Sequence, residues 1–224
     1  MVKGNRVEYN RIRTFINSYA KDDMAELQQL YDEALSDGVP VIRREMRDFI
    51  RCIITAVRPA GILEIGTAVG YSALSMACML QEMKIEFRID TVELERKNAD
   101  EAEKNFEKFS MNQKIFLHRG DAAVLLKEKK NFLEKYDLVL IDAAKAQYKI
   151  YMEEVIKMTD PGAVILTDNV FMDGEVLESH NLVKKRDRTI HDNMREYLYM
   201  IKNTDKLETS ILAIGDGIAM SVRK

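Results

Sequence analysis

The segment ILEIGTAVGYS, residues 62–72, constrains the fold of this chain more than any other stretch. Its apolar first half reads as a short strand, two glycines follow, and a helix-forming stretch begins at Ser72. A strand, a glycine turn and a helix in this order are typical of open α/β sheets, in which ligands bind outside the carboxyl ends of the strands. Gly66 and Gly70 allow the backbone to pass close to a bulky small molecule.

The spacing of the acid and the glycines indicates which ligand this turn accepts. A dinucleotide-binding turn has the pattern G-x-G-x-x-G, which puts a pyrophosphate at the helix N-terminus. Here the pattern is E-x-G-x-x-x-G, from Glu64 to Gly70. It favours a cofactor without phosphates whose cationic amino end meets the acid, a description that S-adenosylmethionine fits. The alternatives are an ordinary turn with glycines for geometry and a dehydrogenase, which the missing third glycine disfavours.

After residue 60, segments typical of strands and of helices alternate along the chain. We predict strands over 61–66, 87–92, 114–118, 136–142 and 162–167, with helices over 72–81, 95–109, 122–126 and 148–158. The runs 138–141 and 164–166 are continuously apolar, as in parallel strands that are buried on both faces. The alternation predicts an α/β fold with a doubly wound, mostly parallel sheet.

The two ends of the chain differ from this alternating pattern. Apolar spacing predicts helices over 7–19, 24–36 and 43–57, and a further helix over 186–202. Residues 209–214 and 218–222 flank Gly215-Asp216-Gly217, which predicts a C-terminal antiparallel hairpin with a three-residue loop. Such a hairpin favours the seven-stranded, Rossmann-like methyltransferase sheet. We expect one domain over 1–224, with an N-terminal helical cap (1–58) and a cofactor-binding core (59–224).

Two acids at the ends of predicted strands fit the rest of such a cofactor. Glu93 ends the second strand, where an acid accepts hydrogen bonds from ribose hydroxyls. A solvated acid at a strand end is the alternative. Asp121, after the third strand, is expected to cap the next helix, with contact between its side chain and an adenine amino group as the alternative. The backbone near Gly120 is expected to line an adenine pocket.

Oxygen-bearing side chains follow the fourth and fifth strands. Asp142 ends one strand and Asp168-Asn169 end the next, so their oxygens converge if the two strands are neighbours. Oxygen ligands with open positions suit a hard cation, Mg²⁺ first. The alternative is that each residue only caps the turn after its strand. Lys145, three residues beyond Asp142, is either a catalytic base or a surface lysine at a helix start.

Motifs spread over most of the chain carry a resemblance to a known family. They are Glu64-Ile65-Gly66-Thr67, Gly70-Tyr71-Ser72, Val92-Glu93, Ile141-Asp142-Ala143-Ala144-Lys145 and Thr167-Asp168-Asn169-Val170. With them the chain, from about Val39 to Ser221, resembles the cation-dependent O-methyltransferases, which include the catechol and caffeoyl-CoA enzymes. The plant-type enzymes have a second acid where this chain has Ala144, which argues against a phenylpropanoid substrate.

Within that family, the chain is most similar to the bacterial branch that methylates 5-hydroxyuridine at the tRNA wobble position, giving 5-methoxyuridine. The similar segments are 141–148, 167–170 and 214–217. The resemblance implies that S-adenosylmethionine contacts Ile42, Ser72, Glu93, Gly120, Asp121, Ala122 and Asp142. It also implies that Asp142, Asp168 and Asn169 hold Mg²⁺ and that Lys145 is the general base. Related enzymes are often dimers, so we expect a homodimer.

The charge of the chain leaves the acceptor open. The net charge of −3 gives no global basic field, so contact with an anticodon loop depends on local clusters, at 184–188 and at Arg43-Arg44 with Arg47. Tyr71, Tyr148 or Phe171 could stack on a flipped base, although apolar packing is the commoner role. The alternatives are a small-molecule, catechol-type O-methyltransferase and a non-catalytic RNA-binding module.

Two further features bear on where the protein works. No apolar run approaches the ~20 residues of a membrane-spanning helix, and the N-terminal segment is polar. Cys52 and Cys78 lie in apolar helical patterns, which predicts buried free thiols. We therefore expect a cytoplasmic protein without a membrane partner.

Overall fold

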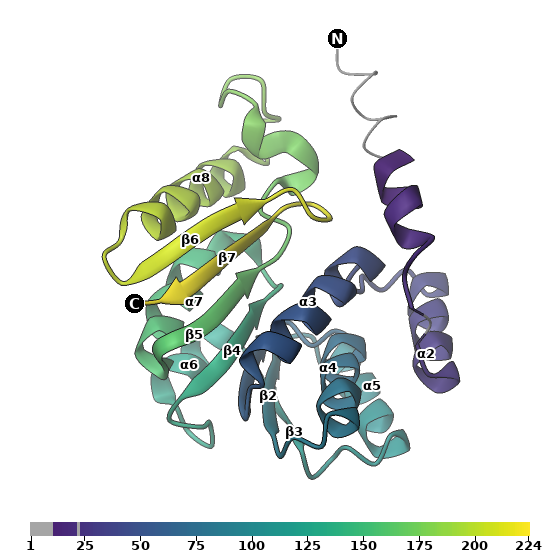
Figure 1. Ribbon diagram of the computed structural model, residues 1–224. Helices are drawn as coiled ribbons and strands as arrows, with labels where there is room; N and C mark the ends of the chain where they lie inside the picture. Colours follow the sequence, from purple (N-terminus) through teal and green to yellow (C-terminus); the bar gives the residue numbers. More distant parts are fainter. Residues whose placement is uncertain (1–10, 22) are drawn as a thin grey trace.

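A computed structural model of the chain describes residues 11–21 and 23–224 (Figure 1). The helix predicted over 7–19 is present over residues 11–17, and its part before residue 11 lies outside the described residues. In the part of the chain that the structure describes, no helix is both long and apolar enough to cross a bilayer.

A seven-stranded sheet forms the centre of the molecule, with the order β3-β2-β1-β4-β5-β7-β6. Its strands are β1 (Gly61–Ile65), β2 (Arg88–Glu93), β3 (Ile115–Arg119), β4 (Tyr136–Ile141), β5 (Thr159–Thr167), β6 (Leu207–Leu212) and β7 (Ile218–Arg223). The first five are parallel, whereas β7 is antiparallel to both β5 and β6. The predicted doubly wound sheet with a C-terminal antiparallel hairpin is therefore confirmed.

The register of the parallel strands places their carboxyl ends at one level. Ile65 at the end of β1 pairs with Val92 on one side and with Ile141 on the other. Ile141 in turn pairs with Thr167 at the end of β5. The residues that follow these strands therefore emerge side by side along one edge of the sheet, as in other open α/β sheets.

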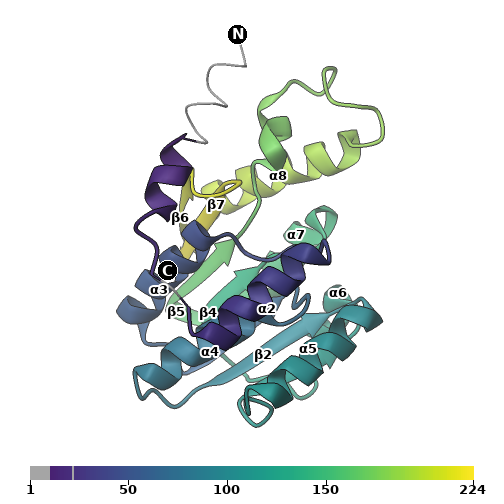
Figure 2. The ribbon, with the colours of Figure 1, turned by 90° about the vertical axis from the view of Figure 1, so that its right-hand side faces the viewer.

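Helices cover both faces of the sheet (Figures 1 and 2). One face carries α2 (Ala25–Ser36), α3 (Arg44–Val57), α4 (Tyr71–Glu82) and α5 (Arg96–Lys108), and the other carries α6 (Ala122–Glu128), α7 (Tyr148–Val155) and α8 (Arg188–Asn203). Alternate residues of a strand join opposite cores, so Ile62 packs with the first group of helices and Leu63 with the second. Gly61, Ile62, Leu63 and Ile65 of β1 are buried, as its apolar sequence predicts, and the charged residue Glu64 is buried as well.

Local sequence explains where these helices begin and end. In α3, Met46, Ile50 and Ile54 repeat every four residues and form its buried stripe. Arg58 then takes a left-handed conformation (φ 50°) and ends the helix before Pro59. At α6, the Asp121 carboxylate accepts a hydrogen bond from the Ala123 amide at 2.8 Å, which is the predicted cap.

A buried ion pair joins the N-terminal segment to the core. Arg47 of α3 is 1 % exposed and binds the Asp23 carboxylate, and the Tyr71 hydroxyl donates a hydrogen bond to the same carboxylate at 2.8 Å. The prediction that Arg47 contributes to a basic RNA-binding surface is therefore wrong, because its guanidinium is buried against its own chain. The stacking role considered for Tyr71 fails for the same reason, since the ring is 2 % exposed.

Two further expectations need correction. Cys52 is exposed on α3 and Cys78 is only half-buried, so the prediction of buried thiols is wrong. The hairpin connection covers residues 213–217 rather than three residues. It is longer because its backbone binds elsewhere: the Asp216 and Gly217 carbonyls accept hydrogen bonds from the Phe171 and Val170 amides.

Replacing Gly66 with alanine tests the close packing of the β1 turn against β4. A Cβ atom at Gly66 (φ +103°) would lie 1.9 Å from the Asp142 carbonyl oxygen, whereas one at Gly162 (φ +95°) would meet nothing within 4 Å. Strain alone should cost Gly162→Ala about 1–2 kcal/mol of unfolding free energy. Gly66→Ala should lose about 1–3 kcal/mol more, because backbone atoms must move.

Urea denaturation of both variants measures this difference, with equal m-values showing that only stability has changed. Equal losses in the two variants would contradict the close contact at Gly66.

Candidate active site

A cavity of about 480 Å³ opens at the carboxyl ends of β1, β2, β4 and β5, a size typical of small-molecule sites. Its walls include most of the residues that the sequence predicts for a cofactor and a metal. They are Ile42, Gly66, Ser72, Glu93, Gly120, Asp121, Ala122, Asp142, Asp168 and Asn169. The strand register explains this convergence, because it brings the ends of four strands to one edge.

Glu93 is fixed at the cavity by two backbone amides. Its Oε2 accepts a hydrogen bond from the Ala68 amide and its Oε1 accepts one from the Glu95 amide, both at 2.8 Å. A carboxylate offers about four acceptor positions, so the side chain can still accept bonds from the hydroxyls of a ligand. The arrangement is therefore suited to holding a ribose.

Glu64 does not line the cavity but lies beneath it. Its side chain is fully buried and accepts a hydrogen bond from the Thr91 hydroxyl at 2.5 Å, and that hydroxyl also bonds to the hydroxyl of Thr67 at 2.6 Å. Burial raises the pKa of Glu64 to about 7, although the hydroxyls of Ser72 and Thr91 act in the opposite direction. Glu64 thus supports the turn that carries Thr67, and a direct contact with a cofactor stays a prediction.

Asp142, Asp168 and Asn169 meet between the ends of β4 and β5. The Asn169 amide nitrogen donates a hydrogen bond to Asp142 Oδ1 at 3.0 Å, and the Asn169 backbone amide donates one to Asp168 Oδ1 at 2.7 Å. Burial raises the pKa of both carboxyl groups, and the charge of Asp142 raises that of Asp168 further. Two carboxylates are therefore held close together with only partial compensation of their charge.

This donor set fits a hard divalent cation. Carboxylate and amide oxygens are the ligands that Mg²⁺ prefers, and a cation would offset the repulsion between the two carboxylates. At present Asn169 presents its amide nitrogen to Asp142, so ligation by its oxygen requires the amide to turn over. Asn169 has a left-handed backbone conformation (φ 57°), which asparagine tolerates better than most residues do. This conformation directs the chain after β5 so that Asn169 lies beside Asp142.

Lys145 lies near Asp142 without lining the cavity. It begins the short helix η1 (Lys145–Gln147), and its positive charge lowers the pKa of Asp142 against the larger effect of burial. Its side chain is half-buried. This placement is compatible with a base near an acceptor oxygen, and the role itself stays a prediction.

Two polar residues of the site were not predicted in this role. Arg43 lines the cavity, and its charge lowers the pKa of Asp168, against burial. Asp216, expected only as a turn residue, accepts a hydrogen bond from the Asp173 amide at 2.8 Å and is buried. Its position beside the site depends on the pairing of β7 with β5, which joins distant parts of the sequence, so no local pattern signals it.

The aromatic residues considered for base stacking are mostly structural. Tyr148 is 1 % exposed, and its hydroxyl donates a hydrogen bond to the Asp168 carbonyl at 3.2 Å. Phe171 is half-buried against the hairpin loop, where a Cβ atom at Gly217 would lie 2.5 Å from its ring. Tyr148 therefore supports the backbone of Asp168 and cannot stack on a ligand as it stands.

Comparison with known proteins identifies similar sequences and folds. A family model described as O-methyltransferase matches residues 16–224. The caffeoyl-CoA O-methyltransferase 1 of Arabidopsis thaliana is 29% identical over 180 residues, covering 78% of this chain and 68% of the plant protein. A catechol O-methyltransferase of Niastella koreensis is 30% identical over 137 residues, 59% of each chain.

The fold is also found among solved structures. The crystal structure of an O-methyltransferase from Bacillus cereus in complex with SAH superposes with a TM-score of 0.82 at 24% identity. The match covers 96% of this chain and 97% of the other. At this level of identity the match shows a shared fold.

Magnesium binding should weaken as the solution becomes more acidic. Burial and mutual repulsion raise the pKa of Asp142 and Asp168, and protons then compete with the cation for the same oxygens. Affinity should rise with pH until both groups are deprotonated, by up to about tenfold per pH unit for each proton displaced. Calorimetric titration with Mg²⁺ at pH 6 and pH 8 measures this, and proton release appears as a buffer-dependent heat.

Asp160→Asn is the matched control, since this exposed residue lies at the opposite end of β5 and pairs with Lys135. It should bind Mg²⁺ as the parent protein does, whereas Asp168→Asn should not. An affinity that is the same at both pH values would contradict ligation by these carboxylates.

Proposed function

This chain belongs to the O-methyltransferase family, and we propose that it transfers the methyl group of S-adenosylmethionine to an acceptor that carries two adjacent oxygens. The observation that supports this most directly is the meeting of Asp142, Asp168 and Asn169 beside the cavity. We propose that these three residues hold Mg²⁺. Glu93, Ser72, Ile42 and the turn around Gly120, Asp121 and Ala122 would then bind the methyl donor.

Different residues of the chain have different roles in this reaction. Bound Mg²⁺ would favour the deprotonated form of the acceptor oxygen. Lys145 would accept the proton of the acceptor hydroxyl at Nζ, and Glu93 would fix the donor through its ribose. An oxygen–carbon bond forms as the sulfur–carbon bond of the donor breaks, and S-adenosylhomocysteine leaves. Holding the reacting atoms in line supplies much of the acceleration.

A small molecule with vicinal oxygens is the acceptor that the comparisons favour. The similar proteins from Niastella koreensis and Arabidopsis thaliana carry the names of catechol and caffeoyl-CoA enzymes. A catechol presents two neighbouring oxygens, which suits chelation of a cation between two carboxylates. We therefore propose a catechol-type acceptor as the first candidate.

A tRNA nucleoside is the second candidate, and one observation favours it. Lys184, Lys185 and Arg186 are all exposed in the segment between β5 and α8, which projects beyond the carboxyl ends of the strands (Figures 1 and 2). Such a segment could contact the phosphates of an anticodon loop. In 5-hydroxyuridine, the 5-hydroxyl and the C4 carbonyl form the same adjacent pair of oxygens, so this candidate uses the same site. With this candidate we propose that the protein works in the cytoplasm.

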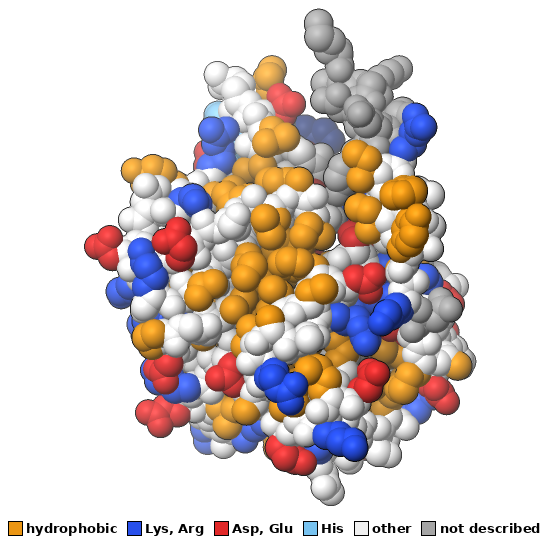
Figure 3. Space-filling view, in the orientation of Figure 1, with side chains coloured by type: hydrophobic (Ala, Val, Ile, Leu, Met, Phe, Trp, Pro, Cys, Tyr) orange, Lys and Arg blue, Asp and Glu red, His pale blue; other side chains and the backbone are white. Residues whose placement is uncertain are grey.

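We further propose that the protein forms a homodimer through an apolar face. On the side of the sheet covered elsewhere by α2 to α5, no helix within residues 11–21 and 23–224 lies over β6 and β7 (Figure 1). Met220 and Val222 of β7 are only half-buried there, as is Ile53 of α3. Figure 3 shows hydrophobic side chains gathered across this part of the surface, the kind of patch that marks an interface.

Methyl transfer tests the function and separates the two acceptors. With labelled S-adenosylmethionine and Mg²⁺, we expect label in catechols, and label in tRNA from cells lacking the modification if the second candidate holds. Asp168→Asn should reduce transfer at least about 100-fold with either acceptor, because a cation ligand is lost. Asp160→Asn should leave the rate unchanged.

The double variant Lys184→Glu/Lys185→Glu is a second test that distinguishes a tRNA acceptor from a catechol acceptor. It should slow transfer to tRNA and leave transfer to catechols intact. Label in catechols alone would remove the tRNA candidate, and full activity of Asp168→Asn would overturn the proposed site.

Light scattering during size-exclusion chromatography tests the dimer. Met220→Lys places a charge on the apolar face of β7 and should convert the dimer to a monomer at micromolar concentration. Ile211→Lys is the matched control, because Ile211 pairs with Ala219 and so points to the other face of the sheet. A parent protein that elutes as a monomer would contradict the proposal.

A further inference from the structure

Two histidines and a carboxylate meet outside the cavity, among the residues that the structure describes. His180 lies in the segment after the short helix η3 (Met172–Leu177), and His191 and Asp192 lie in the first turns of α8. One ligand atom from each of the three lies within 4.8 Å of the others. The cluster therefore links α8 to the segment that follows η3.

Each ring nitrogen of His191 faces an oxygen. Its Nε2 lies 3.1 Å from the Glu178 carbonyl oxygen, and since a carbonyl only accepts, Nε2 carries a hydrogen. Its Nδ1 lies 2.9 Å from Asp192 Oδ1. In the tautomer with its one hydrogen on Nε2, the lone pair of Nδ1 points toward the carboxylate and can bind a metal ion.

His180 approaches the same carboxylate from the other side. Its Nδ1 lies 2.9 Å from Asp192 Oδ2 and 3.0 Å from Oδ1. His191 is 1 % exposed, while the side chain of His180 is half exposed to solvent. The cluster thus has one buried imidazole, that of His191, and one imidazole that solvent can reach, that of His180.

We propose that His180, His191 and Asp192 bind a divalent transition metal ion, zinc in the first place. The ligands are Nδ1 of each histidine and one carboxylate oxygen, with water in the fourth position. Zinc–nitrogen and zinc–oxygen bonds of about 2.0–2.2 Å require ligand atoms roughly 3.3 Å apart in a tetrahedron. The two histidine–carboxylate spacings of 2.9 Å would widen by a few tenths of an ångström, and the two histidine nitrogens, which lie within 4.8 Å of each other, would adjust to the same spacing. The ion would be bound through the lone pairs of the two Nδ1 atoms and of the carboxylate.

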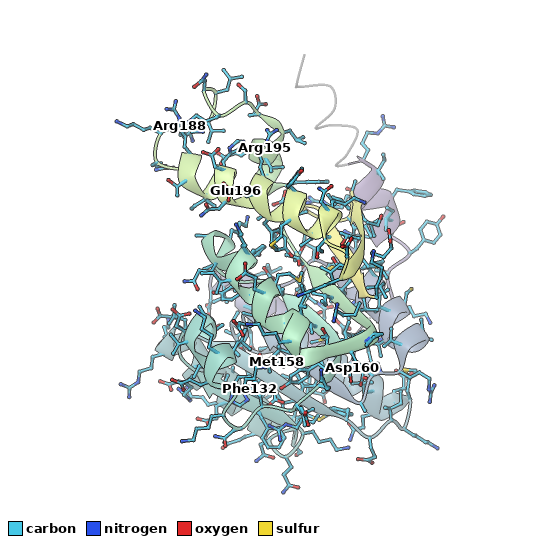
Figure 4. All side chains as sticks on the ribbon, turned by 90° about the vertical axis from the view of Figure 1, so that its left-hand side faces the viewer. Phe132, Met158, Asp160, Arg188, Arg195 and Glu196 are labelled. Carbon is cyan, nitrogen blue, oxygen red and sulfur yellow. The ribbon has the colours of Figure 1, made fainter. Side chains whose placement is uncertain are left out.

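The surroundings of the cluster match those of a metal site. A metal-bound histidine usually donates its other N–H to a carbonyl or a carboxylate, as His191 does to Glu178. Two arginines of α8 hold the segment in place: Arg195 donates hydrogen bonds to the Val176 and Glu178 carbonyls, and Arg188 donates to those of Asn181 and Val183 (Figure 4). The donors are therefore positioned before an ion arrives.

A bound ion would join the two ends of the segment from residue 180 to residue 191. This segment contains the exposed basic stretch 184–186 and continues from the chain that leaves β5 at Asn169. The proposal does not depend on methyl transfer, because none of its ligands lines the cavity. Its consequence is an ordered segment beside the mouth of the active site.

Metal titration of chelator-treated protein tests this proposal. Co²⁺ bound by two imidazoles and a carboxylate gives a visible d–d absorption, and Zn²⁺ should displace it at one equivalent. Excess Mg²⁺ is present throughout, so that the carboxylates of the cavity are occupied. His180→Ala and Asp192→Asn should each weaken Co²⁺ and Zn²⁺ binding at least about tenfold.

Two variants serve as controls. Glu196→Gln alters an exposed carboxylate on the same helix and should bind like the parent protein (Figure 4). Asp168→Asn should also keep the Co²⁺ absorption, which separates this site from the one proposed for methyl transfer. Circular dichroism of each variant confirms that it is folded.

Three results would overturn the proposal. The first is a parent protein that takes up no Co²⁺ or Zn²⁺, which would leave the cluster as a set of hydrogen-bonded side chains only. The second is unchanged binding in both His180→Ala and Asp192→Asn. The third is loss of the absorption in Asp168→Asn, which would move the ion to the cavity.

Discussion

The alignment of Ile65, Ile141 and Thr167 on one level of the sheet is the constraint on which the site depends. Because β1, β4 and β5 end together, Asp142 and Asp168 leave the sheet as neighbours, whatever the loops beyond them do. A shift of one residue in the pairing of β4 with β5 would turn each side chain to the opposite face. Alternate residues of β4 and β5 pack into two different cores, so such a shift would disrupt the close packing on both faces of the sheet.

This arrangement brings two carboxylates together, and the surrounding residues reduce the electrostatic repulsion between them. Asn169 donates to both aspartates, once through its side chain and once through its backbone. The charge of Arg43 favours the ionised form of Asp168, and that of Lys145 favours the ionised form of Asp142. The pKa of each carboxyl group is nevertheless raised, so the repulsion is only partly offset. Sites of catalysis commonly retain such unrelieved charge.

The sequence predicts the parts of this molecule that local patterns determine. Continuous apolar strands, the glycine turn and the Asp121 cap follow from the short-range preferences of their residues, and each occurs as expected. The burial of Arg47 was missed because its partner, Asp23, is distant in the sequence. Glu64 is fully buried and does not line the cavity, because the alternation of side chains along β1 points it to the same face as Ile62, where the hydroxyls of Ser72 and Thr91 lie. Contacts between segments that are distant in the sequence therefore determine the burial of these charged residues, which local patterns do not predict.

The loop between β6 and β7 has a consequence for the biosynthesis of the protein. Its carbonyl groups bind the amides of Val170 and Phe171, and Asp216 binds the amide of Asp173, so the chain just after Asn169 is held by residues some 45 positions later. β7 must also insert between β5 and β6. A nascent chain that has not yet extruded β7 from the ribosome therefore lacks the contacts that hold residues 170–173. The segment directly after the acidic pair can reach its final position only once the hairpin has been synthesised.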